Sequence, residues 1–268
     1  MQSDVEAVVE RLRESRSLPW LRVIDDADLD RPAEQEAGPD VVVAPYRWLL
    51  DRVGAGVRLT QAGYLPPALV TEAMAALGWE GDWIGKHNRE DLTLPILELR
   101  ESAQRFGLLH KNRGQLLVTK VGRTLVDDPA GLWWHVAARL PDARSEPERH
   151  GGVLYLLTVA AGRALDDALL AEGMSILGWA DGGTRRALSA SSAFGAVRDT
   201  WATFSRLGLL PKRVRWNQPD PAPTLEARTL ARAALLGRAV TSSGTAPRQA
   251  VSKLQKTAMN KMRESIFV

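Results

Sequence analysis

The residues in this sequence whose types and spacing could carry chemistry are cations gathered in and around two predicted hairpins. Lysine and arginine side chains in such places can neutralise phosphates and release counterions, which is the chemistry of nucleic-acid binding. The candidate contacts to duplex DNA are Arg105, Lys111, Arg113, Lys120 and Arg123 in the first set, and Lys212, Arg213, Arg215 and Trp216 in the second. The alternative is that these charges are solvated and protect a strand edge from pairing with another chain.

A second group of chemically capable residues lies in the loop EGDWIGKHNREDLT, where histidine and carboxylates stand close together in sequence. These side chains, His87, Arg89, Glu90 and Asp91, include types that bind metals or transfer protons. Consecutive loop positions rarely converge on one ion. We therefore interpret the segment as a polar loop in which Thr93 caps the next helix.

Elsewhere the sequence lacks the motifs of common enzymes. It has no phosphate loop of the G-x-x-x-x-G-K-S/T kind, no G-x-S-x-G elbow and no H-E-x-x-H zinc motif. His110, His135 and His150 stand apart from one another and are more simply surface or core histidines. We therefore expect no catalytic residues, no cofactor and no metal, and we expect that the protein is not an enzyme.

The first set of cations is positioned by residues 94–126, LPILELRESAQRFGLLHKNRGQLLVTKVGRTLV. Apolar residues recur at helical spacing in its first part, which predicts a helix with one buried face. That face comprises Ile96, Leu99, Ala103 and Phe106. Gly107 is expected to end the helix, because a helix commonly ends at a residue in the left-handed conformation that glycine adopts easily.

A hairpin and a further helix are predicted next. Residues 108–111 and 115–118 are expected to be strands, joined by a three-residue loop at 112–114 with glycine where positive φ is needed. Thr119 can cap a helix through Leu125, because its hydroxyl can accept a bond from a free backbone N–H. Helix, hairpin and helix in this order form the back half of a winged helix-turn-helix. The expected fold is therefore mainly α with small β-hairpins.

The same pattern occurs twice, which predicts two related domains. The matching segments are 72–79 with 172–179, 104–109 with 205–210, and 119–125 with 224–230. We expect tandem winged helix-turn-helix-like domains at 46–140 and 151–240. The copies differ, because the second lacks an equivalent of LTQAGYL and has a longer hairpin with three prolines, KRVRWNQPDPAPT.

Three further segments flank or connect the two predicted domains. Residues 1–45 are expected to hold an N-terminal helix followed by an acidic linker, and residues 141–150 a second polar linker. Residues 241–268 form a basic tail that is either disordered or an amphipathic helix over 248–267. As a helix, the tail could associate with a second copy of the chain, bind another protein, dock on the body or contact an acidic surface.

Composition and charge restrict the class of protein. The 268 residues include no cysteine, 45% hydrophobic and 25% charged side chains, as in soluble globular proteins. The net charge of +3 hides an acidic beginning and a basic end. No apolar run reaches the roughly eighteen residues of a membrane span, and the start MQSDVEAVVERL lacks a signal-peptide core. We expect a cytoplasmic protein that does not contact a membrane.

Four segments carry a resemblance to a known family: LTQAGYL, GKHNREDLTLP, ELRESAQRFGLL and VTKVGRTLVDDPAGLW. They resemble the C-terminal region of the actinobacterial proteins named after the third open reading frame of the Ri plasmid. The resemblance covers roughly residues 45–240. Many members carry an additional globular domain before this region, where this sequence has an acidic segment. The family has no established activity, so the resemblance implies the fold and a bacterial cytosolic setting, and no site residues.

Mixed charge on the helices that precede the two hairpins bears on function. Their exposed charges are expected to be Glu98, Arg100, Glu101 and Arg105 on the first helix, and Arg198, Asp199 and Arg206 on the second. Carboxylates facing a DNA groove are repelled by phosphates unless they accept from a cytosine amino group. These helices therefore argue against strong DNA binding. The sequence predicts a DNA-binding regulator or accessory factor on the strength of its basic wings, which would contact phosphates. The alternative is a non-catalytic protein-interaction scaffold, because fold alone does not determine function.

Overall fold

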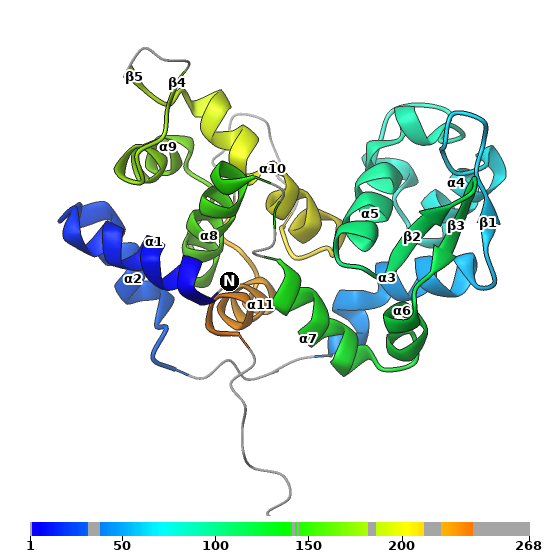
Figure 1. Cartoon of the computed structure of the whole chain (residues 1–268), viewed down its shortest axis with the longest axis horizontal. Coiled ribbons are helices and arrows are strands. Elements are labelled where there is room, and N and C mark those ends of the chain that lie inside the picture. The colour runs from blue at the N-terminus through cyan, green and yellow to red at the C-terminus, as the bar shows by residue number, and fades with distance from the viewer. Residues whose placement is uncertain are drawn as a thin grey trace, which may run out of the picture. The chain divides into compact units, whose positions relative to one another are not determined.

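The computed structural model describes residues 2–31, 38–140, 143, 145–181, 186–211 and 221–237 (Figure 1). These residues form a mainly helical structure with a small three-stranded antiparallel sheet, which confirms the expected class of fold. The helices are α1 (Gln2–Glu14), α2 (Leu18–Ala27), α3 (Pro39–Val53), α4 (Pro67–Ala76), α5 (Leu94–Arg105), α6 (Lys120–Leu125), α7 (Pro129–Arg139), α8 (Glu146–Ala160), α9 (Asp167–Ile176), α10 (Ala190–Arg206) and α11 (Leu225–Leu236). The strands are β1 (Val57–Arg58), β2 (Leu109–Asn112), β3 (Gln115–Val118), β4 (Ala180–Asp181) and β5 (Arg186–Ala187).

The three-stranded sheet joins a strand before α4 to the hairpin after α5, and its order is β1-β3-β2. Asn112 lies opposite Gln115, so the turn consists of Arg113 and Gly114 alone, with φ angles of 47° and 77°. The prediction of a three-residue loop at 112–114 is therefore wrong by one residue, because Asn112 belongs to β2. Two successive residues with positive φ form the tight turn whose twist matches that of the flanking strands.

The sequence repeat reappears in the way α5 and α10 end. Gly107 follows α5 with a φ of 71°, and Gly208 follows α10 with a φ of 70°. The N–H of Leu108 donates to the carbonyl of Ala103 at 2.9 Å, and the equivalent bond from the N–H of Leu209 measures 3.0 Å. This left-handed ending satisfies a carbonyl that the helix itself leaves free. The predicted helix end at Gly107 is thus confirmed, and the helix of the second copy ends in the same way.

Helices α4 and α9 also end alike, but the tryptophans that follow them have different partners. The N–H groups of Trp79 and Trp179 donate to the carbonyls five residues earlier, at 2.9 and 3.0 Å. The ring of Trp79 lies 5.7 Å from the guanidinium carbon of Arg206, whereas Nε1 of Trp179 donates to Nδ1 of His150 at 2.9 Å. The two tryptophans therefore share the same backbone hydrogen bond, but their side chains have different partners.

The first 45 residues contain more helix than the sequence indicated. Helix α2 begins after Ser17, whose hydroxyl accepts from the N–H of Trp20, and α3 begins at Pro39 and continues through Pro45. Both α1 and α2 pack on α8 and α9. Trp20 is fully buried, and a Cβ added to Gly173 of α9 would lie 2.5 Å from its ring. The prediction of a single helix in this segment is wrong, because α2 is stabilised by partners far along the chain, and residues 32–37 of the predicted linker lie outside the described residues.

The predicted linker at 141–150 is also shorter than expected. Helix α8 begins at Glu146, and Ser145 caps it. The Ser145 hydroxyl accepts from the N–H of Glu148 at 3.4 Å, and the Glu148 carboxylate accepts from the N–H of Ser145 at 3.1 Å. In this reciprocal capping box, each side chain accepts from a backbone N–H group at the start of the helix. The helix therefore begins within the stretch that was predicted to be a linker.

An aromatic pair lies at the centre of each half of the structure. Tyr46 of α3 meets Phe106 edge-on with ring centroids 5.9 Å apart, and Tyr155 of α8 meets Phe204 of α10 edge-on at 5.8 Å. Both phenylalanines are fully buried, and the burial of Phe106 confirms the helix phase predicted from the sequence. Helix α11 packs on α8 and on α7, so the two halves share one extended core.

Two further findings concern membrane-spanning helices and the C-terminal residues. Across the part of the chain that the structure describes, no helix has the length and apolarity to cross a membrane. Residues 238–268, which include the predicted amphipathic tail, lie outside the described residues.

Candidate nucleic-acid interface

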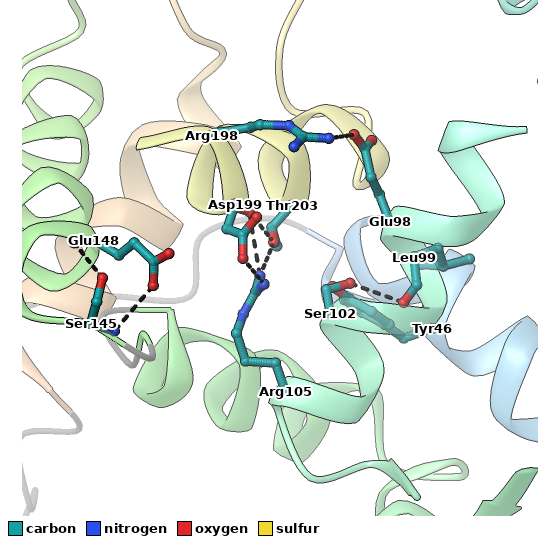
Figure 2. Close-up of polar contacts among 10 residues, drawn as sticks. All are labelled: Tyr46, Glu98, Leu99, Ser102, Arg105, Ser145, Glu148, Arg198, Asp199 and Thr203. Atoms are coloured by element: carbon teal, nitrogen blue, oxygen red, sulfur yellow. Dashed lines mark hydrogen bonds and ion pairs between the residues drawn. The ribbon is translucent and has the colours of Figure 1, made fainter. Parts of the chain in front are cut away.

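Helix α5, which precedes the β2–β3 hairpin, packs against α10, its counterpart in the second copy (Figure 2). Nη1 of Arg105 donates to Oδ2 of Asp199 at 2.6 Å, and Nη2 donates to the hydroxyl of Thr203 at 3.2 Å. The Arg105 side chain is only 17% exposed. Arg105 therefore bonds within the protein, although the sequence placed it among the DNA contacts.

A second set of ion pairs crosses the same contact in the opposite direction. Oε2 of Glu98 lies 3.4 Å from Nε of Arg206, and Oε1 lies 3.9 Å from Nη2 of Arg198. Glu98 and Asp199 are 101 positions apart, as are Arg105 and Arg206. The contact is therefore reciprocal, like the interface of a two-fold dimer. Burial raises the pKa of Glu98, and the nearby arginines oppose that shift.

Helix α5 has little exposed charged surface. Glu101 is the only residue of α5 whose side chain is largely exposed. Arg100, which was expected to be exposed, is 2% exposed. A helix that reads the major groove needs several side chains free to reach base edges. In this structure α5 has no cationic face available for that role.

Arg100 is buried because it pairs with a carboxylate from the preceding loop. Its Nε donates to Oε1 of Glu90, and its Nη1 donates to Oε1 of Gln104 at 2.5 Å. The other oxygen of Glu90 accepts from the N–H of Leu65 at 2.7 Å. Glu90 is 1% exposed, so its charge is compensated entirely within the protein. Sequence reasoning missed this pair, because the segment of Glu90 was expected to be a polar loop, whereas residues Glu90–Leu92 form a short 3-10 helix.

The remaining polar residues of this loop have separate partners. Arg89 pairs with Asp91 at 2.6 Å, and Nε2 of His87 lies 2.6 Å from the carbonyl oxygen of Trp83. The Thr93 hydroxyl donates to the carbonyl of Arg89 at 2.7 Å and does not cap α5, contrary to expectation. In the described part of the chain, no three histidine or carboxylate side chains converge to hold a metal.

We call the β2–β3 hairpin, residues 109–118, the wing. Nζ of Lys111 donates to the carbonyl of Gly63 at 2.8 Å, which ties the wing to the preceding turn, and partial burial lowers the pKa of Lys111. Arg113 is exposed at the wing tip. It shares a polar recess of about 580 Å³ with Arg58 of β1, and the other lining residues are Leu59, Thr60, Gln61, Gly114 and Gln115.

The two arginines of this recess have no carboxylate partner among the residues that the structure describes. Sequence reasoning missed Arg58, because only the β1–β3 pairing brings it beside the wing: Arg58 lies opposite Gln115. The LTQAGYL segment that follows β1 supplies the rest of the wall, through Thr60 and Gln61. The pairing of β1 thus creates a site where two uncompensated positive charges meet polar side chains.

Lys120 and Arg123 lie on α6, directly after the wing. Both are exposed, and Nη1 of Arg123 donates to the carbonyl of Val118 at 2.7 Å. Thr119 caps α6 as predicted, since its hydroxyl accepts from the N–H of Gly122 at 2.9 Å. Lys120 and Arg123 line a second cavity, which His110, Leu117 and Val118 of the wing also line. The four candidates of the second hairpin lie outside the described residues: Lys212, Arg213, Arg215 and Trp216.

Comparisons with known proteins do not add to this site. No protein-family model, no curated protein and no solved structure matches the chain.

Proposed function

We propose that this chain is a DNA-binding protein, a regulator or accessory factor, that holds duplex DNA by its backbone phosphates. The single observation that carries the proposal is the meeting of Arg58 and Arg113 at the polar recess of the wing. Two uncompensated guanidinium groups with neighbouring hydroxyl and amide side chains suit a phosphate, because arginine donates several hydrogen bonds in a planar fork.

The order of elements in residues 39–125 supports the proposal. A helix, a strand, two helices and a hairpin, with the first strand paired to the last, is the arrangement of winged-helix domains. In such domains the wing contacts the DNA backbone beside the groove that the preceding helix enters. Here α5 is covered by α10, so only the wing half of that arrangement is available. We therefore propose phosphate binding with little sequence preference.

A titration of the full chain with random duplex DNA at several salt concentrations tests the proposal. When binding is through phosphates, the logarithm of the association constant falls linearly with the logarithm of the salt concentration, with a slope of about −0.9 per phosphate neutralised. Replacing both Arg58 and Arg113 with glutamine should make that slope shallower by up to about two units. The matched control is Arg13→Gln, at an exposed position on α1 away from the recess. An unchanged slope in the double variant would remove the wing from the proposal.

The basic tail must be tested separately, because its lysines can attract DNA without help from the fold. The chain ending at Gly237 keeps the whole of the first compact unit, so it is the appropriate comparison. Salt-dependent binding by this shorter protein would support the wing. Loss of all binding in the shorter protein would assign DNA binding to the tail.

A protein-interaction scaffold is the second candidate function, and one loop favours it. Ile84 is 98% exposed and Leu92 is 61% exposed. Their loop is held by a bond of 2.8 Å from Nε1 of Trp83 to the carbonyl of Leu92, and by the contact of His87 with Trp83. An ordered loop that displays apolar side chains is suited to docking on a protein. Absence of DNA binding in both chain lengths would favour this function.

A further inference from the structure

The cavity beside the wing has the size and lining of a small-molecule site. It is open to solvent and has a volume of about 550 Å³ between the end of α3, the strand β3 and the start of α6. Its apolar lining residues are Leu50, Ala55, Leu117, Val118 and Val126. Pockets that bind small molecules are typically about 300–1,000 Å³ and mostly apolar, with a few polar groups that orient the ligand.

The polar side chains of this cavity are mainly basic. They are His110, Thr119, Lys120 and Arg123, with Asp51 as the one acid among the lining residues. The bond from Nη1 of Arg123 to the carbonyl of Val118 holds the guanidinium in place and leaves its other nitrogens free to donate to a ligand. Lys120 is exposed, so its ammonium group can reach the same opening. Charge at the opening therefore favours an anion.

We propose that this cavity binds a small amphiphilic carboxylate, with its apolar body on the lining and its carboxylate at Arg123 and Lys120. A phosphate of DNA would meet the cations but would leave the apolar wall formed by the half-buried Leu117 and the exposed Ala55 uncovered. An acyl or aromatic body removes that wall from water, which is favourable in proportion to the apolar area covered. Arg123 forms the planar, two-point contact that suits a carboxylate.

Calorimetric titration of the full chain with octanoate tests this site, and 1-octanol serves as the neutral ligand of equal length. Octanoate should bind saturably with one equivalent per chain, and 1-octanol should bind at least about tenfold more weakly, because it lacks the charge-assisted bonds. Arg123→Ala should weaken octanoate binding by a similar factor, and Arg123→Lys by less. Ala55→Phe should block binding, since Ala55 is an exposed lining residue whose enlargement fills the cavity.

Two controls separate this site from other effects. Arg13→Ala removes a positive charge from α1, away from the cavity, and should leave octanoate binding unchanged. The double variant of Arg58 and Arg113 should also bind octanoate normally, so failure of the DNA-binding proposal does not affect this result. Thermal unfolding must show that each variant remains folded. Absence of saturable octanoate binding, or equal weakening by Arg13→Ala, would overturn the proposal.

Discussion

Replacing Arg113 with asparagine should stabilise the protein while weakening its proposed binding of DNA. Arg113 occupies the first turn position of the wing at a φ of 47°. For an L-residue other than asparagine or glycine, this left-handed conformation costs roughly 1–2 kcal/mol. Asparagine followed by glycine is the preferred pair for such a turn. The side chain of Arg113 is exposed, so its removal sacrifices little packing.

The expected gain in the free energy of unfolding for Arg113→Asn is about 0.5–1 kcal/mol, the part of the backbone strain that asparagine relieves. For a protein of this size, that gain corresponds to a rise in the melting temperature of about 1–4 °C. Urea unfolding at unchanged m-value should show the same gain as a higher midpoint. The slope of DNA affinity against salt should become shallower by about one unit, because one phosphate contact is lost.

Arg113→Ala separates the backbone effect from the charge effect. Alanine removes the guanidinium but adopts the left-handed conformation no more readily than arginine. It should therefore weaken DNA binding as much as asparagine does, without the gain in stability. A midpoint for Arg113→Asn at or below that of Arg113→Ala would refute the argument from backbone strain. An unchanged salt slope in both variants would refute the role of Arg113 in binding phosphate.

Three further predictions concern stability. Gly122→Ala should destabilise the protein by about 1–3 kcal/mol, because the added Cβ would lie 2.4 Å from the carbonyl oxygen of Leu108. Gly195→Ala on α10 should stabilise it by about 0.5–1 kcal/mol, because the added Cβ has no neighbouring atom within 4 Å and alanine favours the helix. Similar urea midpoints for the two variants would contradict both expectations. Burial raises the pKa of Tyr46 from 10.0 to about 12, so the unfolded chain ionises first and stability should fall by roughly 2–3 kcal/mol between pH 10 and 12. The fall should be smaller in Tyr46→Phe, and an equal fall in that variant would exclude Tyr46 as its cause. Burial also raises the pKa of Glu98, so the stabilising effect of its protonated form is complete below the ordinary value of 4.5 and is lost as pH rises through the folded-state pKa. The stability of the native protein relative to Glu98→Gln should therefore decrease over that interval, and an increase would reverse the sign of the argument.

Local features of the sequence were sufficient to predict several helix boundaries and the burial of a central aromatic residue. Gly107 ends a helix and Thr119 caps one through bonds to residues within a few positions, so their effect can be inferred from neighbouring residues alone. The burial of Phe106 follows from helical periodicity in the same way. These features depend on backbone chemistry and side-chain spacing, which any short window of the sequence contains.

The partners of the charged side chains were decided by tertiary structure. Arg105 meets Asp199, 94 positions later in the chain, and Arg100 is buried on Glu90, although all four read as exposed or loop charges in the sequence. Arg58 reaches the wing only because β1 pairs with β3. A charged side chain has no periodic signal that identifies its partner. Its role depends on which elements the packing of apolar faces brings together, and that choice involves the whole chain.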